Sequence, residues 1–464
     1  MSVRHHSLTT ILTAFQPKRK PRRMTDKRFG KTIPSSRLRR LGHFGGLAAG
    51  IAGNVVAGGV RELASGKRPR MSELMLTPAN AFKVTGKLAE MRGAAMKLGQ
   101  LLSMDSGDFV PPELAEILAR LRADAEPMTD AQLAKILVTQ WGENWRGKLS
   151  AFDARPIAAA SIGQVHRARS IDGRDLAVKI QYPLIANSID SDVDNASMLL
   201  KASGLLPRHI DIKPLLAEAK MQLHDEADYV REAAYLARYA KALGDDARFV
   251  VPEILPEIST PTILAMTYVP GVAIEQLSMR PQEERDRAAH VLMDLVLREL
   301  FEFGVMQSDP NLANYRYDPG TGSIVLLDFG AARDVSPEIE QFYRQMLSAG
   351  LTGDQAKLRG ALEDFGLIDD QMSAGHVNSV TRLFDMIIEP MLHQGAFDFG
   401  NNGLMHAIRD QGFALLNDRA NWRLPPAELF FVQRKLGGMY HLAARLRARV
   451  DIGALLRIHL EKSS

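Results

Sequence analysis

Alternating apolar and polar positions predict β-strands near the middle of the chain. The stretch "AAASIGQVHRARSIDGRDLAVKIQYP", residues 158–183, fits two strands joined by a turn at Asp172-Gly173, because Asp-Gly between two alternating runs is typical of a hairpin. The second of these strands, "LAVKIQ", carries a single lysine, Lys179. Residues 249–271, "FVVPEILPEISTPTILAMTYVPG", predict two further strands and a turn at Pro270-Gly271.

Apolar residues at the helical period predict helices on both sides of the hairpin. Apolar positions in "TPANAFKVTGKLAEMRGAAMKLGQLLSMD", residues 77–105, recur at the helical period. The segment "PPELAEILARLRADAEPMTDAQLAKIL", residues 111–137, predicts two more amphipathic helices. Beyond the hairpin, "LLAEAKMQLHDEADYVREAAYLARYA", residues 215–240, predicts one long helix that is rich in acids. A helical extension up to about Ser150 therefore precedes the strands.

Composition limits the class of protein. The chain has 464 residues, of which 46% are hydrophobic and 24% are charged. These values indicate a globular protein that is too long for one ordinary domain. The absence of cysteine excludes disulfides and thiolate metal sites, and it fits a reducing compartment.

Charge is concentrated at the start of the chain. Residues 1–40 contain 12 Lys or Arg side chains and one acid, Asp26, whereas the remainder carries a small negative net charge. A basic arm of this kind suggests an anionic surface, either lipid or nucleic acid. A solvated leader and an organelle transit peptide are alternatives for the first residues. Met24 is an alternative first residue.

Residues 41–60, "LGHFGGLAAGIAGNVVAGGV", have no formally charged side chain and the length of a bilayer span. Their seven glycines, together with His43 and Asn54, argue against a transmembrane helix, so we expect a soluble or peripheral protein. On a helix, small residues four apart would allow close approach of a second helix, and hence a homodimer. The residues of this stripe are Gly42, Gly46, Gly50 and Gly58. A flexible glycine-rich linker explains the composition equally well.

The strongest chemical pattern is "MQSDPNLANYRYDPGTGSIVLLDFGAARDV", residues 306–335. Asp309 is followed five residues later by Asn314, and Asp328-Phe329-Gly330 comes after a predicted strand. Protein kinases have the same Asp-to-Asn spacing and a later metal-binding Asp-Phe-Gly. One carboxylate orients or deprotonates the nucleophile, while an amide and a second carboxylate hold Mg²⁺ across the phosphates. With Lys179 and an acidic helix upstream in kinase order, coincidence is a poor explanation.

These motifs resemble the UbiB/ADCK-type atypical kinases, and within them the branch that serves coenzyme Q (ubiquinone) biosynthesis. The resemblance runs from about Ser36 to the C-terminus. It is carried by "KLGQ" at Lys97–Gln100, "AAASIGQVHRA", "AVKIQYP", "EADYVREA", "QSDPNLAN" and "LLDFGA". The implied fold is α+β, a two-lobed protein-kinase-like fold with a family-specific N-terminal helical extension.

The resemblance and the patterns together suggest a division of the chain. Residues 1–40 form a basic, disordered leader and residues 41–70 a Gly/Ala-rich segment. Residues 71–150 form the helical extension with the KxGQ motif. Residues 151–270 form a kinase-like N-lobe with an alanine-rich loop, and residues 271–464 a mostly helical C-lobe.

The resemblance also implies roles for individual residues. Lys179 would bind the nucleotide phosphates, with Glu232 as its ion-pair partner. Asp309 would be the counterpart of the catalytic base. Asn314 and Asp328 would be the metal ligands. The implied cofactors are ATP or ADP and Mg²⁺.

The family-specific elements add a lid and a loop. Lys97 and Gln100 would lie on a helix folded across the active site, where Lys97 joins the catalytic set. Glu226 and Asp228 form the acidic pair thought to engage that helix and contribute to the nucleotide site. The loop over the phosphates would consist of Ala158, Ala159, Ala160, Ser161, Ile162, Gly163 and Gln164.

Three departures from ordinary protein kinases affect the expected activity. Gln307 stands where many relatives have a histidine, a form associated with the coenzyme Q branch. The "APE" segment of protein kinases is absent after Gly330, which puts docking of a protein substrate in doubt. Alanines replace the loop glycines, and their Cβ atoms stiffen the loop and limit its approach to the phosphates.

We therefore expect an atypical kinase or ATPase that binds Mg-nucleotide and supports ubiquinone biosynthesis at a membrane surface. The alternatives are a true kinase for a protein or small molecule, and a nucleotide-gated module that binds quinone precursors without essential turnover. Expected partners are an anionic membrane, prenylated quinone precursors and coenzyme Q biosynthesis proteins, with no nucleic acid. The expected location is cytoplasmic and peripheral to the membrane in a bacterium, or the mitochondrial matrix in a eukaryote.

Overall fold

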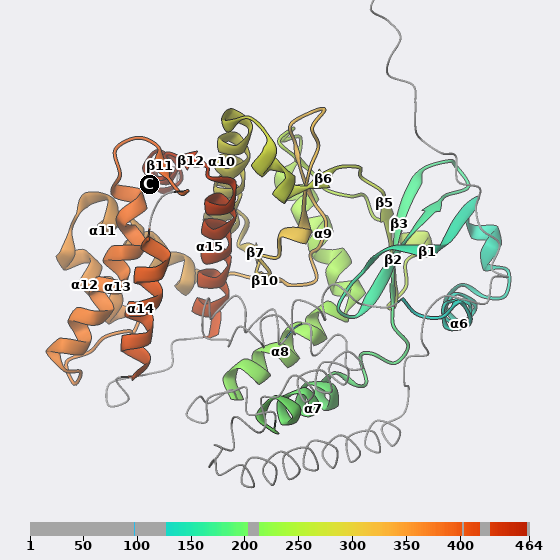
Figure 1. The fold of residues 1–464 in the computed structure, drawn as a ribbon, viewed down its shortest axis with the longest axis horizontal. Helices are drawn as coiled ribbons and strands as arrows, with labels where there is room; N and C mark the ends of the chain where they lie inside the picture. Colours follow the sequence, from blue (N-terminus) through green and yellow to red (C-terminus); the bar gives the residue numbers. More distant parts are fainter. Residues whose placement is uncertain (1–96, 98–126, 203–212, 401–402, 418–426, 462–464) are drawn as a thin grey trace, which may run out of the picture.

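A four-stranded antiparallel sheet forms the smaller lobe. The computed structural model describes residues 97, 127–202, 213–400, 403–417 and 427–461, and Figure 1 shows the sheet at one end of them. Its strand order is β1-β2-β3-β5. The strands are β1 (Ala151–Ala159), β2 (Gly163–Arg169), β3 (Asp175–Gln181) and β5 (Ile263–Thr267). The β2–β3 hairpin turns at the predicted Asp172-Gly173, where Gly173 adopts a φ of 91°, a conformation that glycine tolerates best.

Helix α6 (Asp130–Trp141) covers one face of this sheet. It begins with a capping box, in which Thr129 and Gln132 satisfy each other's backbone amides. Its apolar face packs on β3 and β5, and the Trp141 indole donates to Ile258 O at 2.8 Å. A short 3₁₀ turn follows at Trp145–Lys148. One of the two helices predicted in residues 111–137 is therefore confirmed, and the other lies outside the described residues.

Two helices, rather than one, occupy residues 215–240. After α7 (Ile189–Ala202), α8 spans Lys213–Glu226 and α9 spans Tyr229–Leu243. The prediction of one long helix is therefore wrong. The break occurs because Asp228 Oδ1 accepts the Arg231 amide at 2.9 Å, which makes Asp228 the N-cap of a new helix.

The two strands predicted in residues 249–271 exist, but they join different sheets. β5 belongs to the sheet of the smaller lobe, whereas β4 (Phe249–Val250) pairs in parallel with β9 (Ile324–Leu326). β8 (Tyr315–Tyr317) and β6 (Val272–Ala273) complete this second sheet in the order β4-β9-β8-β6. A third ladder pairs β7 (Val305–Gln307) with β10 (Ala332–Asp334). A 3₁₀ turn at Leu312–Asn314 leads into β8.

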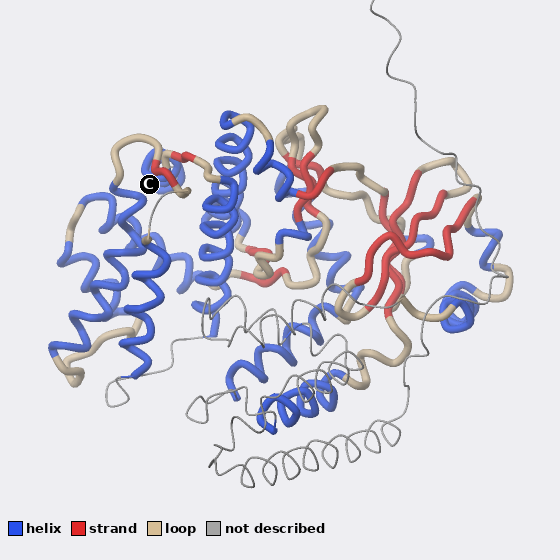
Figure 2. Tube along the Cα trace, in the orientation of Figure 1, coloured by secondary structure: helices blue, strands red, loops and turns tan. Residues whose placement is uncertain are grey.

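The larger lobe is mainly helical (Figure 2). α10 (Gln282–Arg298) continues into a π-helical turn at Glu299–Phe303 and packs against α15 (Ala427–Leu446). The remaining helices are α11 (Pro337–Thr352), α12 (Gln355–Asp364), α13 (Ala374–Leu392), α14 (Leu404–Asn417) and α16 (Ile452–Glu461). A small ladder joins β11 (Phe397–Asp398) to β12 (Arg449–Val450). None of the described helices is long and apolar enough to cross a bilayer.

The two lobes and their mixed helices and sheets confirm the predicted α+β, protein-kinase-like fold. A continuous core of buried apolar side chains runs from α9 through the larger lobe, and a second core lies between α6 and the first sheet. The basic arm, the glycine stripe at 41–60 and Gln100 lie outside the described residues. The proposed domain limits at 1–40, 41–70 and 71–150 remain predictions.

Candidate active site

Lys179, Glu232 and Asp328 meet between the lobes. Lys179 Nζ lies 2.8 Å and 2.9 Å from the two carboxylate oxygens of Glu232, and 3.1 Å from Asp328 Oδ2. β3 supplies the lysine, the first turn of α9 supplies Glu232, and Asp328 follows β9. The Glu232 side chain is 1% exposed, whereas that of Asp328 is 33% exposed. The cluster therefore opens to solvent on the Asp328 side.

The surrounding charges favour the ionised forms of Lys179 and Asp328, the latter at the solvent-exposed side of the cluster. Burial disfavours the Lys179 ammonium, but the carboxylates of Asp328 and Glu232 outweigh it and raise the lysine pKa well above its usual value. Burial also opposes ionisation of Asp328, yet Lys179 and the Gly330 amide hold its pKa below the usual value. For Glu232, burial prevails over Lys179 and raises the pKa to about 7.

Asp309 and Asn314 lie on the loop between β7 and β8. The Asn314 side-chain amide donates to Asp309 O at 3.2 Å, and the Leu327 amide donates to Asn314 O at 3.0 Å. The side-chain amide of Gln307 donates to the main-chain oxygen of Asp328 at 3.3 Å. These bonds fix the loop to the segment that carries Asp328.

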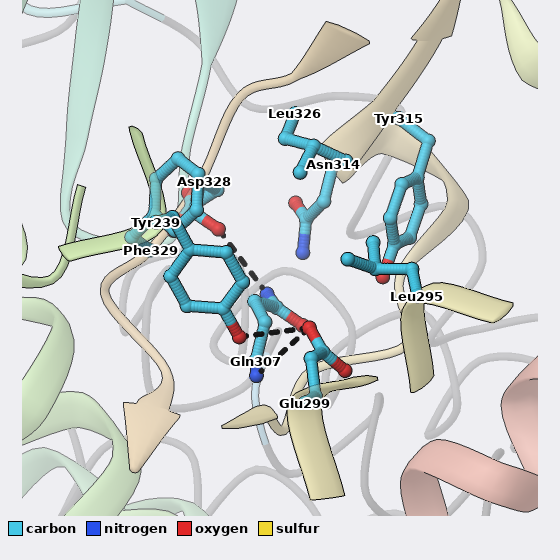
Figure 3. A pocket seen from close by; sticks show the side chains of 9 residues that line it. All are labelled: Tyr239, Leu295, Glu299, Gln307, Asn314, Tyr315, Leu326, Asp328 and Phe329. Atoms are coloured by element: carbon cyan, nitrogen blue, oxygen red, sulfur yellow. Dashed lines mark hydrogen bonds between the residues drawn. The ribbon is translucent and has the colours of Figure 1, made fainter. Parts of the chain in front are cut away.

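A small cavity separates Asn314 from Asp328 (Figure 3). Both offer oxygen atoms, the ligands that Mg²⁺ prefers. The described residues contain no cluster of three or more His, Cys, Asp or Glu side chains that could hold a metal. A metal bound here would depend on phosphate and water oxygens for its other ligands, which is the usual arrangement for Mg²⁺. The donor set therefore fits a magnesium ion that arrives with a nucleotide.

Lys97 links three separate parts of the site. Its ammonium lies 2.5 Å from Glu226 Oε1 and 3.5 Å from Asp309 Oδ2, and the side chain is 1% exposed. The other Glu226 oxygen accepts the hydroxyl of Ser161, at the tip of the alanine-rich loop. The loop, the end of α8, Lys97 and the loop of Asp309 are therefore connected by one chain of polar contacts.

Asp228 does not join that chain of contacts. Although the resemblance pairs it with Glu226, its carboxylate caps α9 and the side chain is exposed. The break between α8 and α9 separates the two acids. Glu226 alone makes the described contact with Lys97.

The alanine-rich loop is shorter than its motif. Ala158 and Ala159 are exposed residues of β1 that pair with Val165 and Gln164. Ala160 N donates to Gly163 O at 2.8 Å, so the tip consists of Ala160, Ser161 and Ile162. Ile162 is buried in the core.

Gly163 and Gln164 have structural roles at the base of the loop. A Cβ on Gly163 would lie 2.4 Å from Ile180 O, so only glycine allows this approach of the strands. Gln164 is 1% exposed, accepts the Met128 amide at 2.9 Å, and contacts His166 Nε2 at 2.8 Å. The polar side-chain atoms of Gln164 are therefore paired in the interior, and a contact with nucleotide would have to come from its backbone. The nucleotide-binding role of this residue stays a prediction.

Arg231 is a site residue that the sequence analysis missed. Its guanidinium donates to Gly330 O at 2.8 Å and to Ala332 O, and thereby holds the backbone after Asp328. Arg333, in the same segment, pairs with Asp225 at 3.2 Å. Arginine on an amphipathic helix gives no sequence signal of such a contact, since an exposed position fits equally well.

The chain is similar to known proteins over most of its length. The family described as the ABC1 atypical kinase-like domain matches residues 120–362. Atypical kinase COQ8, mitochondrial, from Saccharomyces cerevisiae is 39% identical, covering 92% of this chain and 85% of its own. Atypical kinase COQ8B, mitochondrial, from Rattus norvegicus is 37% identical, covering 92% and 81%. The solved complex of Rv3197 with erythromycin from Mycobacterium tuberculosis has a TM-score of 0.57 and 27% identity, covering 83% of this chain and 96% of its own.

Proposed function

The chain belongs to the ABC1 (UbiB/ADCK-type) atypical kinase-like family, and we propose that it binds Mg-nucleotide and hydrolyses or transfers the terminal phosphate in support of coenzyme Q biosynthesis. The observation that carries the proposal is the buried Lys179–Glu232 pair, which lies 3.1 Å from the metal candidate Asp328. Kinases require this lysine, glutamate and aspartate together.

Each side chain then has a defined task. Lys179, oriented by Glu232, would bind the α- and β-phosphates. Asp328 and Asn314 would hold Mg²⁺, which supplies positive charge across the phosphates. Asp309 would orient the attacking hydroxyl or water, since its main-chain carbonyl accepts the Asn314 side-chain amide and keeps the residue beside Asn314.

Lys97 would restrain transfer to large acceptors. It is buried against Asp309 and Glu226, so its ammonium occupies the carboxylate that would otherwise face the acceptor. Its position also obstructs the approach of an acceptor hydroxyl. Slow hydrolysis or transfer to a small acceptor fits this arrangement better than protein phosphorylation.

The partners follow from the family and from the basic arm. The two relatives are named as mitochondrial proteins, so we propose the mitochondrial matrix for a eukaryotic source and the cytoplasmic face of the membrane for a bacterial one. Residues 1–40 would bind anionic lipid, and residues 41–60 would support a homodimer. Prenylated quinone precursors and coenzyme Q biosynthesis proteins are the proposed partners at that surface.

Phosphate release by the purified chain tests the proposal. We expect turnover of Mg-ATP that rises when anionic liposomes and a prenylated phenol are added. A labelled acceptor would instead identify a kinase, and nucleotide binding without turnover would identify a gated binding module. Failure to bind Mg-nucleotide at all would overturn the proposed function.

Deletion of residues 1–60 tests membrane binding separately from nucleotide binding. The deletion should reduce sedimentation with anionic vesicles and leave nucleotide affinity unchanged. Equal sedimentation of both forms would show that the arm does not bind the membrane.

A further inference from the structure

Helix α15 contacts the catalytic loop from a part of the chain beyond the matched family domain, which ends at residue 362. Arg434 Nε donates to Ser308 O at 3.1 Å, and Arg434 Nη2 donates to Ser308 Oγ at 3.3 Å. Ser308 directly precedes Asp309. The third guanidinium nitrogen lies 3.6 Å from Glu218 Oε1 on α8, so one arginine connects the loop to the helix that ends at Glu226.

The next residue of α15 holds the other end of the loop. Lys435 Nζ donates to the Tyr315 hydroxyl at 2.8 Å and lies 3.2 Å from Glu299 Oε2. Tyr315 directly follows Asn314. The Lys435 and Glu299 side chains are 1% and 0% exposed, and a buried pair of this kind holds a fixed geometry, because loss of one partner leaves an uncompensated charge.

Glu299 extends this contact to α9. It accepts the Tyr239 hydroxyl at 2.7 Å, and Figure 3 shows Tyr239, Glu299 and Tyr315 around the cavity beside Asn314. Tyr239 lies on the same helix as Glu232. The α15 lysine is therefore linked by hydrogen bonds to the helix that orients Lys179.

Gly438 brings the helix axis close to the loop. A Cβ on Gly438 would lie 2.0 Å from Pro310 Cβ and 2.6 Å from Pro310 Cγ. Its neighbour Gly437 has no atom within 4 Å of such a Cβ among the described residues. Glycine inside a helix is less favourable than alanine, and at position 438 the close approach of Pro310 requires it.

We propose that Arg434, Lys435 and Gly438 are positioning residues, through which α15 fixes the loop that carries Asp309 and Asn314. Their contacts fall on Ser308 and Pro310, which flank Asp309, and on Tyr315, which directly follows Asn314. The inference rests on the proposed function, since it assigns the loop a catalytic task. Loop geometry and nucleotide binding without Mg²⁺ are separable, because Lys179 and Glu232 make no direct described contact with α15.

The matched substitutions Gly438→Ala and Gly437→Ala test the proposal. Amide hydrogen exchange of residues 305–317 should rise clearly in Gly438→Ala and stay unchanged in Gly437→Ala. Turnover of Mg-ATP should fall about 10- to 100-fold in Gly438→Ala, since a displacement of about 1 Å can have that effect. Nucleotide affinity measured without Mg²⁺ should change less than about threefold, because the phosphate-binding lysine is untouched and the metal candidate Asn314 does not contribute to this measurement.

Arg434→Gln and Arg434→Lys give a second test that adds no steric clash. The glutamine variant should reproduce the loss of turnover with retained affinity, and the lysine variant should recover part of it. Arg445→Gln, at an exposed position of the same helix, is the control and should match the wild type.

The outcomes separate this inference from the proposed function. Unchanged exchange of residues 305–317 in both Gly438→Ala and Arg434→Gln would overturn the positioning role, whatever the turnover. Loss of nucleotide affinity measured without Mg²⁺, in proportion to turnover, would also overturn it. If exchange rises in the variants but the wild-type protein neither binds nor hydrolyses nucleotide, the positioning contacts stand and the catalytic assignment of the loop is rejected.

Discussion

The ammonium of Lys97 lies 3.5 Å from Asp309 Oδ2, and it reaches this carboxylate across more than 200 residues of sequence. Burial opposes its charge, but Asp309 and Glu226 outweigh that effect and raise the Lys97 pKa. The charged lysine thus forms an ion pair with the candidate base. This contact is the basis for proposing a restraining role for Lys97, distinct from the phosphate-binding role proposed for Lys179.

Lys97→Ala should increase self-phosphorylation, whereas Lys179→Ala should abolish phosphate chemistry. The first change releases Asp309 and loosens the contact with Glu226, and the second removes the phosphate-binding cation. Labelled ATP with both variants side by side measures the difference. Loss of activity in both would place Lys97 in the catalytic machinery.

Asp328→Asn should abolish Mg²⁺-dependent nucleotide binding. The amide keeps the size of the carboxylate but loses the charge that would bridge metal to phosphate. Titration of nucleotide with and without Mg²⁺ measures the effect. Asp364→Asn, an exposed residue at the end of α12, is the control, and an unchanged Mg²⁺ dependence in Asp328→Asn would remove the metal assignment.

Ala159→Gly should loosen the alanine-rich loop. Ala159 pairs with Gln164 at the end of β1, and glycine in a strand costs about 0.5–1 kcal/mol relative to alanine while it admits positive φ. We expect a shift in the ratio of ADP to ATP affinity, or a gain in self-phosphorylation. Equal affinities and unchanged transfer would show that the alanines serve packing alone.

Nucleotide affinity should decline as the pH falls below about 7. Burial raises the pKa of Glu232 to about 7, so acidification protonates the partner of Lys179. Because the folded pKa exceeds the usual 4.5, the stability that Glu232 contributes is fully present below pH 4.5 and is lost as the pH rises through 7. Affinity and this stability contribution thus change in opposite directions with pH. Glu232→Gln should have lower affinity that varies little between pH 5.5 and 8.

His166 should produce the opposite pH dependence of stability. Burial lowers its pKa from 6.5 to about 4, so the folded protein loses stability as the pH falls from 6.5 towards 4. The shift corresponds to about 3 kcal/mol. His166→Phe preserves the stacking on Phe152 and should be less stable at pH 7, with a smaller loss on acidification in denaturant titrations. An equal loss in both proteins would contradict the prediction.

The sequence by itself determined the fold class and the candidate residues of the proposed nucleotide site. Lys179, Asp309, Asn314 and Asp328 occur in kinase order, and their chemistry requires those residue types at that spacing. The hairpin at Asp172-Gly173 was also predictable, because turn preference and strand alternation are local properties. The structure places Lys179 against Asp328 and Asn314 against Asp309, and Lys97 bridges Asp309 to Glu226.

Only the tertiary structure decided which polar residues serve the site and which serve the interior. Asp228 could continue a helix or begin a new helix as its cap. Within one helix its carboxylate would lie four residues from the like charge of Glu232 and cost about 0.2–0.5 kcal/mol, whereas the cap contributes about 1 kcal/mol. Gln164 lies within the loop motif, yet Met128 and His166 occupy its amide.

The contacts made by α15 were likewise decided by the tertiary structure. Arg434, Lys435 and Gly438 look like ordinary residues of an amphipathic helix, and their contacts lie more than 100 residues away. Sequence periodicity reports which face of a helix is apolar, because that depends on the local backbone. Which loop that face meets depends on how the whole core packs, and no local pattern encodes it.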